Sequence, residues 1–136
     1  MISVLDTTAF SAAMRYEETL MRYLRSRRPG DVATVEPVIA EVEYGIQRLP
    51  EGSRRRRLLA DEKQRLLEAI RVLSWRPNAS VLFGEMKAHL ENAGTPVDDF
   101  EILIAAIAHS HGAEIITANL AHFLRIPGIT ARHWEP

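Results

Sequence analysis

Polar side chains follow two apolar segments that lie far apart in this 136-residue chain. Asp6 comes directly after the apolar run that ends at Leu5, and Asn119 comes two residues after Thr117, where another apolar run ends. Ligands of open parallel sheets bind beyond the carboxyl ends of the strands. If both runs are strands of one sheet, Asp6 and Asn119 lie at the same edge and can act on one ligand.

Two further acids reach this edge from predicted helices. Glu41 lies three residues after Val38, and Glu101 lies three and four residues before Ile104 and Ala105, so each shares an apolar helix face. An isolated carboxylate on such a face is costly. Acids gathered there repel one another by roughly 4 kcal/mol per pair at ~4 Å and an effective dielectric of ~20. A divalent cation that prefers oxygen ligands, Mg²⁺ or Mn²⁺, would relieve this repulsion.

Each acid taken alone also has a structural interpretation. Asp6 can cap the helix that follows it, and Asp98 with Glu101 has the spacing of a capping box. Glu41 can pair with an arginine, and Glu43 is expected to be solvated because its helical neighbours point elsewhere. The metal-site hypothesis therefore depends on the acids as a set.

Short apolar runs alternate with amphipathic segments along the chain, which is the pattern of a parallel sheet with helices on both faces. Strands are predicted at 2–5, 32–35, 72–74 and 115–117, with a possible edge strand within 129–134. Helices are predicted at about 8–24, from 37 onward, at 54–71, 76–92 and 98–111. We therefore predict one α/β/α domain, residues 1–136, around a mostly parallel sheet of four to five strands.

The helix predicted at 54–71 is strongly charged. Ser53 is placed to cap its first turn, as serine hydroxyls commonly do. Its apolar positions are expected to form the inward stripe: Leu58, Leu59, Leu66, Leu67 and Ile70.

Composition narrows the class of protein. There is no cysteine, which removes disulfides and thiolate chemistry and fits a reducing cytosol. The start of the chain lacks the basic stretch of a signal peptide, and no apolar run approaches the ~18 residues of a membrane helix. We expect a cytoplasmic protein without a membrane partner. With a net charge of −1, any nucleic-acid binding must depend on local basic patches.

Four ordered motifs resemble the PIN-domain family, and more closely its VapC-type toxins. They are Leu-Asp-Thr-Thr at 5–8, Ala-Glu-Val-Glu-Tyr-Gly-Ile at 40–46, Phe-Glu-Ile-Leu-Ile-Ala-Ala at 100–106 and Ile-Thr-Ala-Asn-Leu-Ala-His-Phe at 116–123. The tail at 126–134 also follows the family's ending, so the resemblance covers essentially the whole chain. It maps the family's second acid to Glu41 and not to Glu43.

The resemblance implies a metal-dependent endoribonuclease that hydrolyses RNA phosphodiester bonds. Asp6, Glu41 and Glu101 would be ligands of Mg²⁺ or Mn²⁺, directly or through water, while Thr117 and Asn119 would orient metal-bound water or the phosphate. Thr7 or Thr8 could do likewise. The resemblance also implies a homodimer and inhibition by a cognate VapB-type antitoxin.

Two residues depart from the family pattern. Glu101 replaces the usual Asp and is one methylene longer, so the metal could be displaced, or Asp98 could contribute as a ligand. The fourth position, often Asp, is the neutral Asn119. Because three acids and one Mg²⁺ leave the cluster near −1, we expect one tightly held metal, with a second recruited mainly by substrate phosphate.

Two other functions stay open. A PIN-like protein that has lost catalysis, and only binds RNA or a partner, is compatible with Glu101. A phosphatase of the haloacid dehalogenase type would use Asp6 as nucleophile, but such enzymes carry a second Asp two residues later, where this chain has Thr8.

Basic and aromatic residues give weaker signals. Arg54, Arg55 and Arg28 are candidate contacts to RNA phosphates, with a solvated helix face as the alternative. Trp75 and Trp134 are expected to pack rather than to stack on bases. The histidines show no metal-ligand spacing and are expected to have surface or structural roles: His89, His109, His111, His122 and His133.

Overall fold

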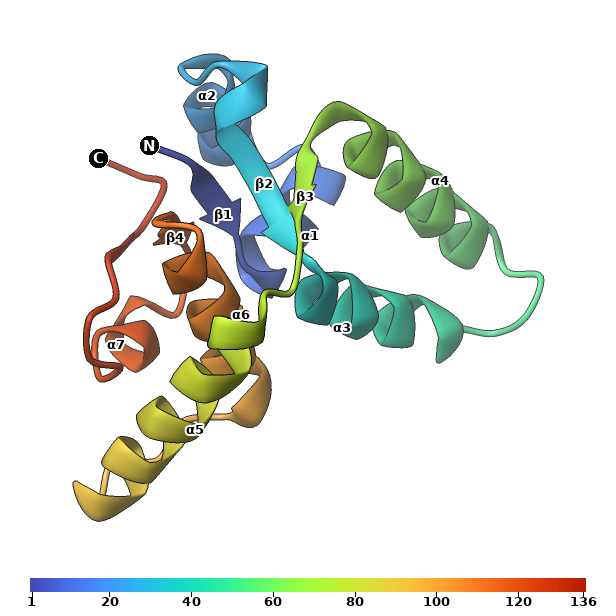
Figure 1. Cartoon of the computed structure of the whole chain (residues 1–136). Helices are drawn as coiled ribbons and strands as arrows, with labels where there is room; N and C mark the ends of the chain where they lie inside the picture. Colours follow the sequence, from blue (N-terminus) through green and yellow to red (C-terminus); the bar gives the residue numbers. More distant parts are fainter.

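Five parallel strands form the central sheet of the computed structural model, which describes all 136 residues (Figure 1). Their order across the sheet is β3-β2-β1-β4-β5. Val4 in the central strand pairs with Ala33 on one side and with Ile115 on the other. The strands are β1 (Ser3–Leu5), β2 (Val32–Val35), β3 (Arg71–Leu73), β4 (Glu114–Ile116) and β5 (Ala131–Arg132). The prediction of an α/β domain with a parallel sheet is confirmed.

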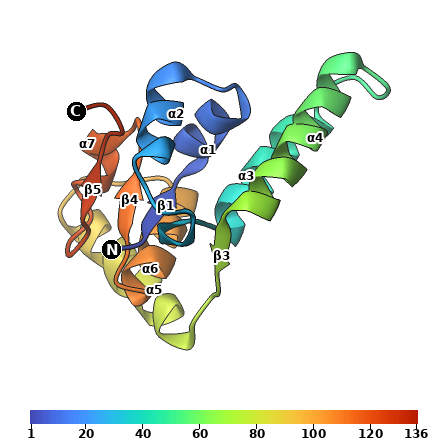
Figure 2. The same ribbon diagram turned by 90° about the horizontal axis from the view of Figure 1, so that it is seen from above.

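Seven α-helices surround the sheet, with α1 and α2 over one face and α5 and α6 over the other (Figure 2). The helices are α1 (Thr7–Met14), α2 (Glu18–Arg25), α3 (Glu36–Gln47), α4 (Arg54–Ala69), α5 (Pro77–Asn92), α6 (Asp99–Ser110) and α7 (Leu120–Phe123). None of these helices combines the length and the apolar character that a membrane crossing requires.

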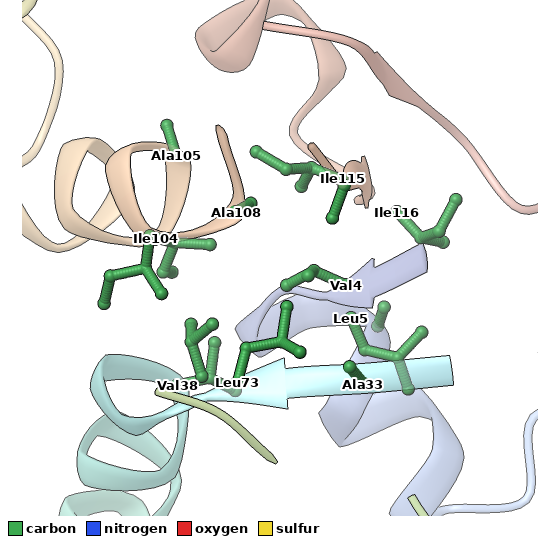
Figure 3. Packing of buried hydrophobic residues seen from close by; sticks show 14 of the residues in the cluster. Val4, Leu5, Ala33, Val38, Leu73, Ile104, Ala105, Ala108, Ile115 and Ile116 are labelled. Atoms are coloured by element: carbon green, nitrogen blue, oxygen red, sulfur yellow. The ribbon is translucent and has the colours of Figure 1, made fainter. Parts of the chain in front are cut away.

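The main core joins the sheet to α1, α3, α5 and α6, and Figure 3 shows part of it near α6. Every residue of β1, β2 and β4 is buried, as expected for parallel strands covered on both faces. Ala108 of α6 lies on the side of Ile115 and Val4, and Ile104 points toward Val38 of α3 and Leu73 of β3. This packing fixes the sheet edge at which Asp6 leaves β1.

The single helix predicted over 8–24 is wrong, because the chain breaks between α1 and α2. Tyr16 adopts a left-handed conformation with φ 55°, which a non-glycine residue rarely takes. The Glu17 carboxylate then caps α2 by accepting hydrogen bonds from the Thr19 and Leu20 backbone amides at 3.0 and 3.1 Å. A side chain that satisfies the free amides of a new first turn makes the break favourable.

The inward stripe predicted for α4 is only partly confirmed. Ser53 caps the helix, since its hydroxyl accepts from the Arg56 amide at 3.1 Å. Leu58, however, is 56% exposed, and no residue of α4 is fully buried. The reason is that α4 lies against α3 in an arm that extends away from the sheet (Figure 2). Trp75 is likewise exposed rather than packed.

Candidate active site

Asp6 ends β1 and begins α1, and its side chain is almost completely buried. Oδ1 accepts hydrogen bonds from the Ala9 amide at 2.9 Å and from the Thr8 hydroxyl at 2.6 Å, while Oδ2 accepts from the Thr117 hydroxyl at 2.5 Å. The predicted cap is therefore present. Burial raises the pKa of Asp6, and the hydrogen bonds from Thr117, Thr8 and Ala9 offset part of that rise.

The two threonines connect Asp6 to the loop after β4. Thr117 Oγ1 accepts from the Asn119 amide at 2.8 Å, and Thr8 Oγ1 accepts from the Ala118 amide at 2.9 Å. Because each hydroxyl accepts from an amide, its hydrogen is free to point at Asp6. Thr117 is fully buried, and its hydroxyl donates to Asp6. The Asn119 side chain, by contrast, is exposed.

Glu101 lies in the first turn of α6, with 15% of its side chain exposed. His122 Nδ1 of α7 lies 3.0 Å from Oε1 and 3.1 Å from Oε2. Burial raises the pKa of Glu101; the His122 contact opposes this rise, and the negative charges of Asp98 and Asp6 add to it. The charges of Asp98 and Asp6 therefore both act on Glu101. For Asp6 and Glu101, the sequence predicts this proximity.

Glu41 is held differently from the other acids. Its Oε1 accepts from the Thr7 hydroxyl at 2.6 Å, and no ion pair with an arginine forms. Its side chain borders a cavity of about 200 Å³ between α1, α3 and α4. Glu43 was expected to be solvated, but it forms an ion pair with Lys63 at 2.7 Å. That contact lowers the pKa of Glu43.

Asp98 caps α6, because its Oδ2 accepts from the Phe100 amide at 3.0 Å. The Asp98 amide does not donate a reciprocal hydrogen bond to Glu101, so no capping box forms, and Glu101 contacts His122 instead. Asp98 is exposed, so it is free to take part in binding a cation through water.

The side chains present fit a hydrated magnesium ion rather than a fully enclosed one. No group of three or more acidic or histidine side chains converges closely enough to hold a metal alone. Burial nevertheless raises the pKa of both Asp6 and Glu101, and the negative charge of Asp6 adds to the rise at Glu101, so a cation would stabilise the charged form of both carboxylates. Mg²⁺ commonly keeps several waters and binds one or two carboxylates. Asp6 and Glu101 therefore supply the type and the number of protein ligands that Mg²⁺ needs.

The arginines proposed from the sequence lie in different places. Arg55 borders the cavity next to Glu41, and Arg54 is exposed on the same helix. Arg28 precedes β2 and therefore lies at the opposite edge of the sheet from Asp6.

Sequence reasoning missed two residues near the acids. Arg15 lines the cavity beside Glu41, and His122 contacts Glu101. The position of Arg15 one helical turn after Ser11, on the face of α1 that also carries Thr7, was the available signal. The spacing of His122 in the sequence did not indicate its contact with Glu101, because the position of His122 depends on the turn that follows Asn119.

Comparison with known proteins gives one family. The family model of the PIN domain matches residues 3–129 of the chain. A relative from Salmonella typhimurium, the tRNA(fMet)-specific endonuclease VapC, is 37% identical over 68 residues. That alignment covers 50% of this chain and 52% of the relative, so the two match over about half their lengths.

Two solved structures are similar over the whole chain. VapBC2 from Rickettsia felis, bound to a DNA fragment from its promoter, superposes with a TM-score of 0.88 at 23% identity, covering 99% of this chain and 100% of that one. DNA-bound VapBC from Salmonella typhimurium gives 0.83 at 26% identity, covering 98% of each chain. At 23% identity the first likeness shows the fold alone.

Proposed function

Because the chain belongs to the PIN-domain family, we propose that it is a VapC-type endoribonuclease toxin that hydrolyses RNA phosphodiester bonds with Mg²⁺ or Mn²⁺. The observation that carries the proposal is the buried Asp6 carboxylate, which two threonine hydroxyls hold at the carboxyl edge of the sheet and whose negative charge helps to raise the pKa of Glu101. The Salmonella relative, which is named an endonuclease for a transfer RNA, supports RNA as the substrate class.

Each acid has a separate part in this proposal. Asp6 and Glu101 would hold the metal, with Glu41 and Asp98 contributing through water. When bound, the metal supplies an activated water and stabilises charge on the attacked phosphoryl group. Thr8 and Thr117 keep the Asp6 carboxylate in one orientation and favour its charged form. The Asn119 side-chain amide is exposed and would donate a hydrogen bond to a phosphate oxygen.

A phosphatase with Asp6 as nucleophile fits the same geometry poorly. A nucleophilic carboxylate oxygen must be reached by the phosphoryl group itself, and Asp6 is only 3% exposed. A metal ion is much smaller and needs only one of the lone pairs that remain on the carboxylate oxygens. Both of its oxygens already accept hydrogen bonds from hydroxyls, and Thr8 stands where such enzymes carry a second acid. We therefore favour hydrolysis by water over attack by Asp6.

The proposed partner is a VapB-type antitoxin, and the proposed assembly is a homodimer. Support comes from the whole-chain similarity to the Salmonella VapBC structure. We expect the antitoxin to inhibit cleavage by covering the acids.

The experiment that tests the proposed function is cleavage of a mixed pool of structured RNAs by antitoxin-free protein. Discrete fragments are expected with Mg²⁺ or Mn²⁺, and they should disappear with EDTA and with Asp6→Ala. Glu85→Ala is the matched control, because Glu85 is an exposed acid on α5 outside the site. If folded protein gave no Asp6-dependent fragments, the binding-only alternative would replace the proposal, and a phosphatase assay would follow.

A further inference from the structure

A groove that starts at the acids runs along α1 and passes two arginines without partners. Its first cavity, beside Glu41 and Thr7, is also bordered by Arg15 and Arg55. A second cavity of about 430 Å³ continues past the same two arginines to Leu58. A third, of about 400 Å³, joins Arg15 to Thr7, Thr8 and Ala118. Arg15 therefore lines all three cavities, and it connects the acid edge to the α4 arm.

Neither guanidinium is neutralised within the molecule. Arg15 and Arg55 take part in no ion pair and in no side-chain hydrogen bond. Two acids line these cavities with the arginines. Glu41 accepts from the Thr7 hydroxyl at 2.6 Å, and Glu62 accepts from the Tyr16 hydroxyl at 2.6 Å and from Arg65 at 3.2 Å. The left-handed turn at Tyr16 places its hydroxyl beside Glu62, so both acids are already engaged.

The floor of the groove between these arginines is apolar. Met14 and Leu59 line both neighbouring cavities, and Leu58 at the far end is exposed. A site that combines two unpaired guanidiniums with an apolar floor suits a ligand with an anionic group and a flat apolar face. A single-stranded nucleotide has both, because its phosphate accepts bidentate hydrogen bonds from arginine and its base is stackable.

We propose that Arg15 and Arg55 bind the phosphate of an RNA nucleotide flanking the scissile bond, and that its base lies over Met14 and Leu58. This inference rests on the proposed ribonuclease function. It adds the path of the RNA chain away from the acids. Charge complementarity favours RNA, since the chain as a whole carries −1 and phosphate attraction must come from local cations. An RNA strand whose phosphate reaches Glu41 and Thr7 meets both arginines in the adjoining groove.

The test measures binding apart from cleavage. Anisotropy of a fluorescein-labelled 12-nucleotide single-stranded RNA is followed with Asp6→Asn protein, alone and combined with Arg15→Gln or Arg55→Gln. Each arginine substitution is expected to raise Kd about tenfold, and to reduce the slope of log Kd against log salt by about 0.7, the value for one phosphate contact on a single strand. Arg57→Gln is the matched control, because Arg57 is exposed on α4 and does not line the groove.

Unchanged RNA affinity and salt slope in both arginine variants would overturn the proposal. It would also be overturned if a peptide of alternating Glu and Leu displaced the RNA from the Asp6→Asn protein as efficiently as unlabelled RNA does, because the groove would then be a protein-docking site. The two proposals fail separately. Arginine-dependent binding without cleavage by the parent protein would retain this inference and refute the nuclease, whereas cleavage with unchanged binding in the variants would do the reverse.

Discussion

His122 Nδ1 contacts both carboxylate oxygens of Glu101, at 3.0 and 3.1 Å, and so ties the first turn of α6 to α7. With Glu101 ionised, its carboxylate only accepts hydrogen bonds, so the hydrogen of this contact is assigned to Nδ1 of His122. Glutamate has one more rotatable bond than aspartate, and fixing it costs conformational entropy. The imidazole supplies that constraint, so His122 is a positioning residue for Glu101.

Replacing His122 should therefore weaken metal binding more than it weakens folding. We expect His122→Ala to raise the Mg²⁺ concentration for half-maximal cleavage by about 10-fold or more, which is the usual cost of losing a group that orients a metal ligand. His122→Asn retains an N–H donor near the same place and should recover part of the loss. Calorimetric Mg²⁺ titration checks this without reference to turnover, with the exposed His89→Ala as control. Equal Mg²⁺ affinity in wild type and His122→Ala would refute the positioning role.

The Asp6 carboxyl makes the metal-free protein sensitive to pH in a defined direction. Because burial raises the pKa of Asp6 above its ordinary value of 3.8, the folded protein binds this proton more tightly than the unfolded chain does. Its contribution to the free energy of unfolding is then favourable at low pH and is lost as the pH rises through the raised pKa. The pKa of Glu101 is likewise raised above its ordinary value of 4.5, so its contribution to stability is also lost as the pH rises.

Urea unfolding in EDTA, at intervals from about pH 4 to about pH 8, measures this effect. Relative to Asp6→Asn, the wild type should lose stability across that interval. Mg²⁺ should restore stability to the wild type and much less to the variant, because a ligand stabilises only the state that binds it. A wild type whose stability relative to Asp6→Asn is constant with pH would contradict the raised pKa.

The number of tight metal sites follows from which acids interact. The negative charge of Asp6 helps to raise the pKa of Glu101, Glu41 is held by Thr7, and Asn119 is neutral. We therefore expect calorimetry to detect one tight Mn²⁺ site per chain in RNA-free protein, and Glu101→Gln to weaken it at least about tenfold. Glu91→Gln, on the exposed surface of α5, serves as control. Two tight sites before RNA is added would show that Glu41 joins the cluster without substrate.

Periodicity predicted the strands well because parallel strands buried on both faces are continuous apolar runs. Val4 and Ile115 illustrate this, since both are fully buried. It failed at Tyr16, where the break depends on a side-chain cap from Glu17 that apolar spacing does not encode. It also failed at Leu58, because a helix in a projecting arm has the same amphipathic pattern as one that packs on a sheet.

The candidate site was predictable to the extent that topology alone decides it. Asp6 and Thr117 meet because parallel strands end at a common edge, which the order of strands and helices implies. The engagement of Glu101 by His122 and of Glu41 by Thr7 depends on side-chain conformations across separate helices. No spacing rule connects such pairs, so they emerged only from the three-dimensional structure.

The C-terminal tail contacts the junction between α1 and α2 through Glu17. Trp134 Nε1 donates to the Glu17 carboxylate at 3.0 Å, and the same indole lines the cavity that contains Thr8 and Ala118. Hydrogen bonds from Thr19 are the main reason that the pKa of Glu17 is lowered from 4.5 to about 2, and those from Leu20 and Trp134 add to the effect. One carboxylate thus caps α2 and holds the tail against α1.

Glu17→Gln should therefore destabilise the protein in a pH-dependent way. A carboxyl group whose pKa is lowered on folding stabilises the protein at pH values above its pKa in the unfolded chain, which is 4.5 for Glu17. This stabilisation is lost as the pH falls toward the folded-state pKa of about 2. The Tm of Glu17→Gln should lie below that of wild type at neutral pH, and the two values should converge in acid. In a Trp75→Phe background, where Trp134 is the one remaining tryptophan, its fluorescence should shift to the red in Glu17→Gln as the indole becomes wetter. Glu18→Gln, the exposed neighbour, is the control; an equal Tm deficit at acid and neutral pH would show that the variant loses packing rather than a charged cap.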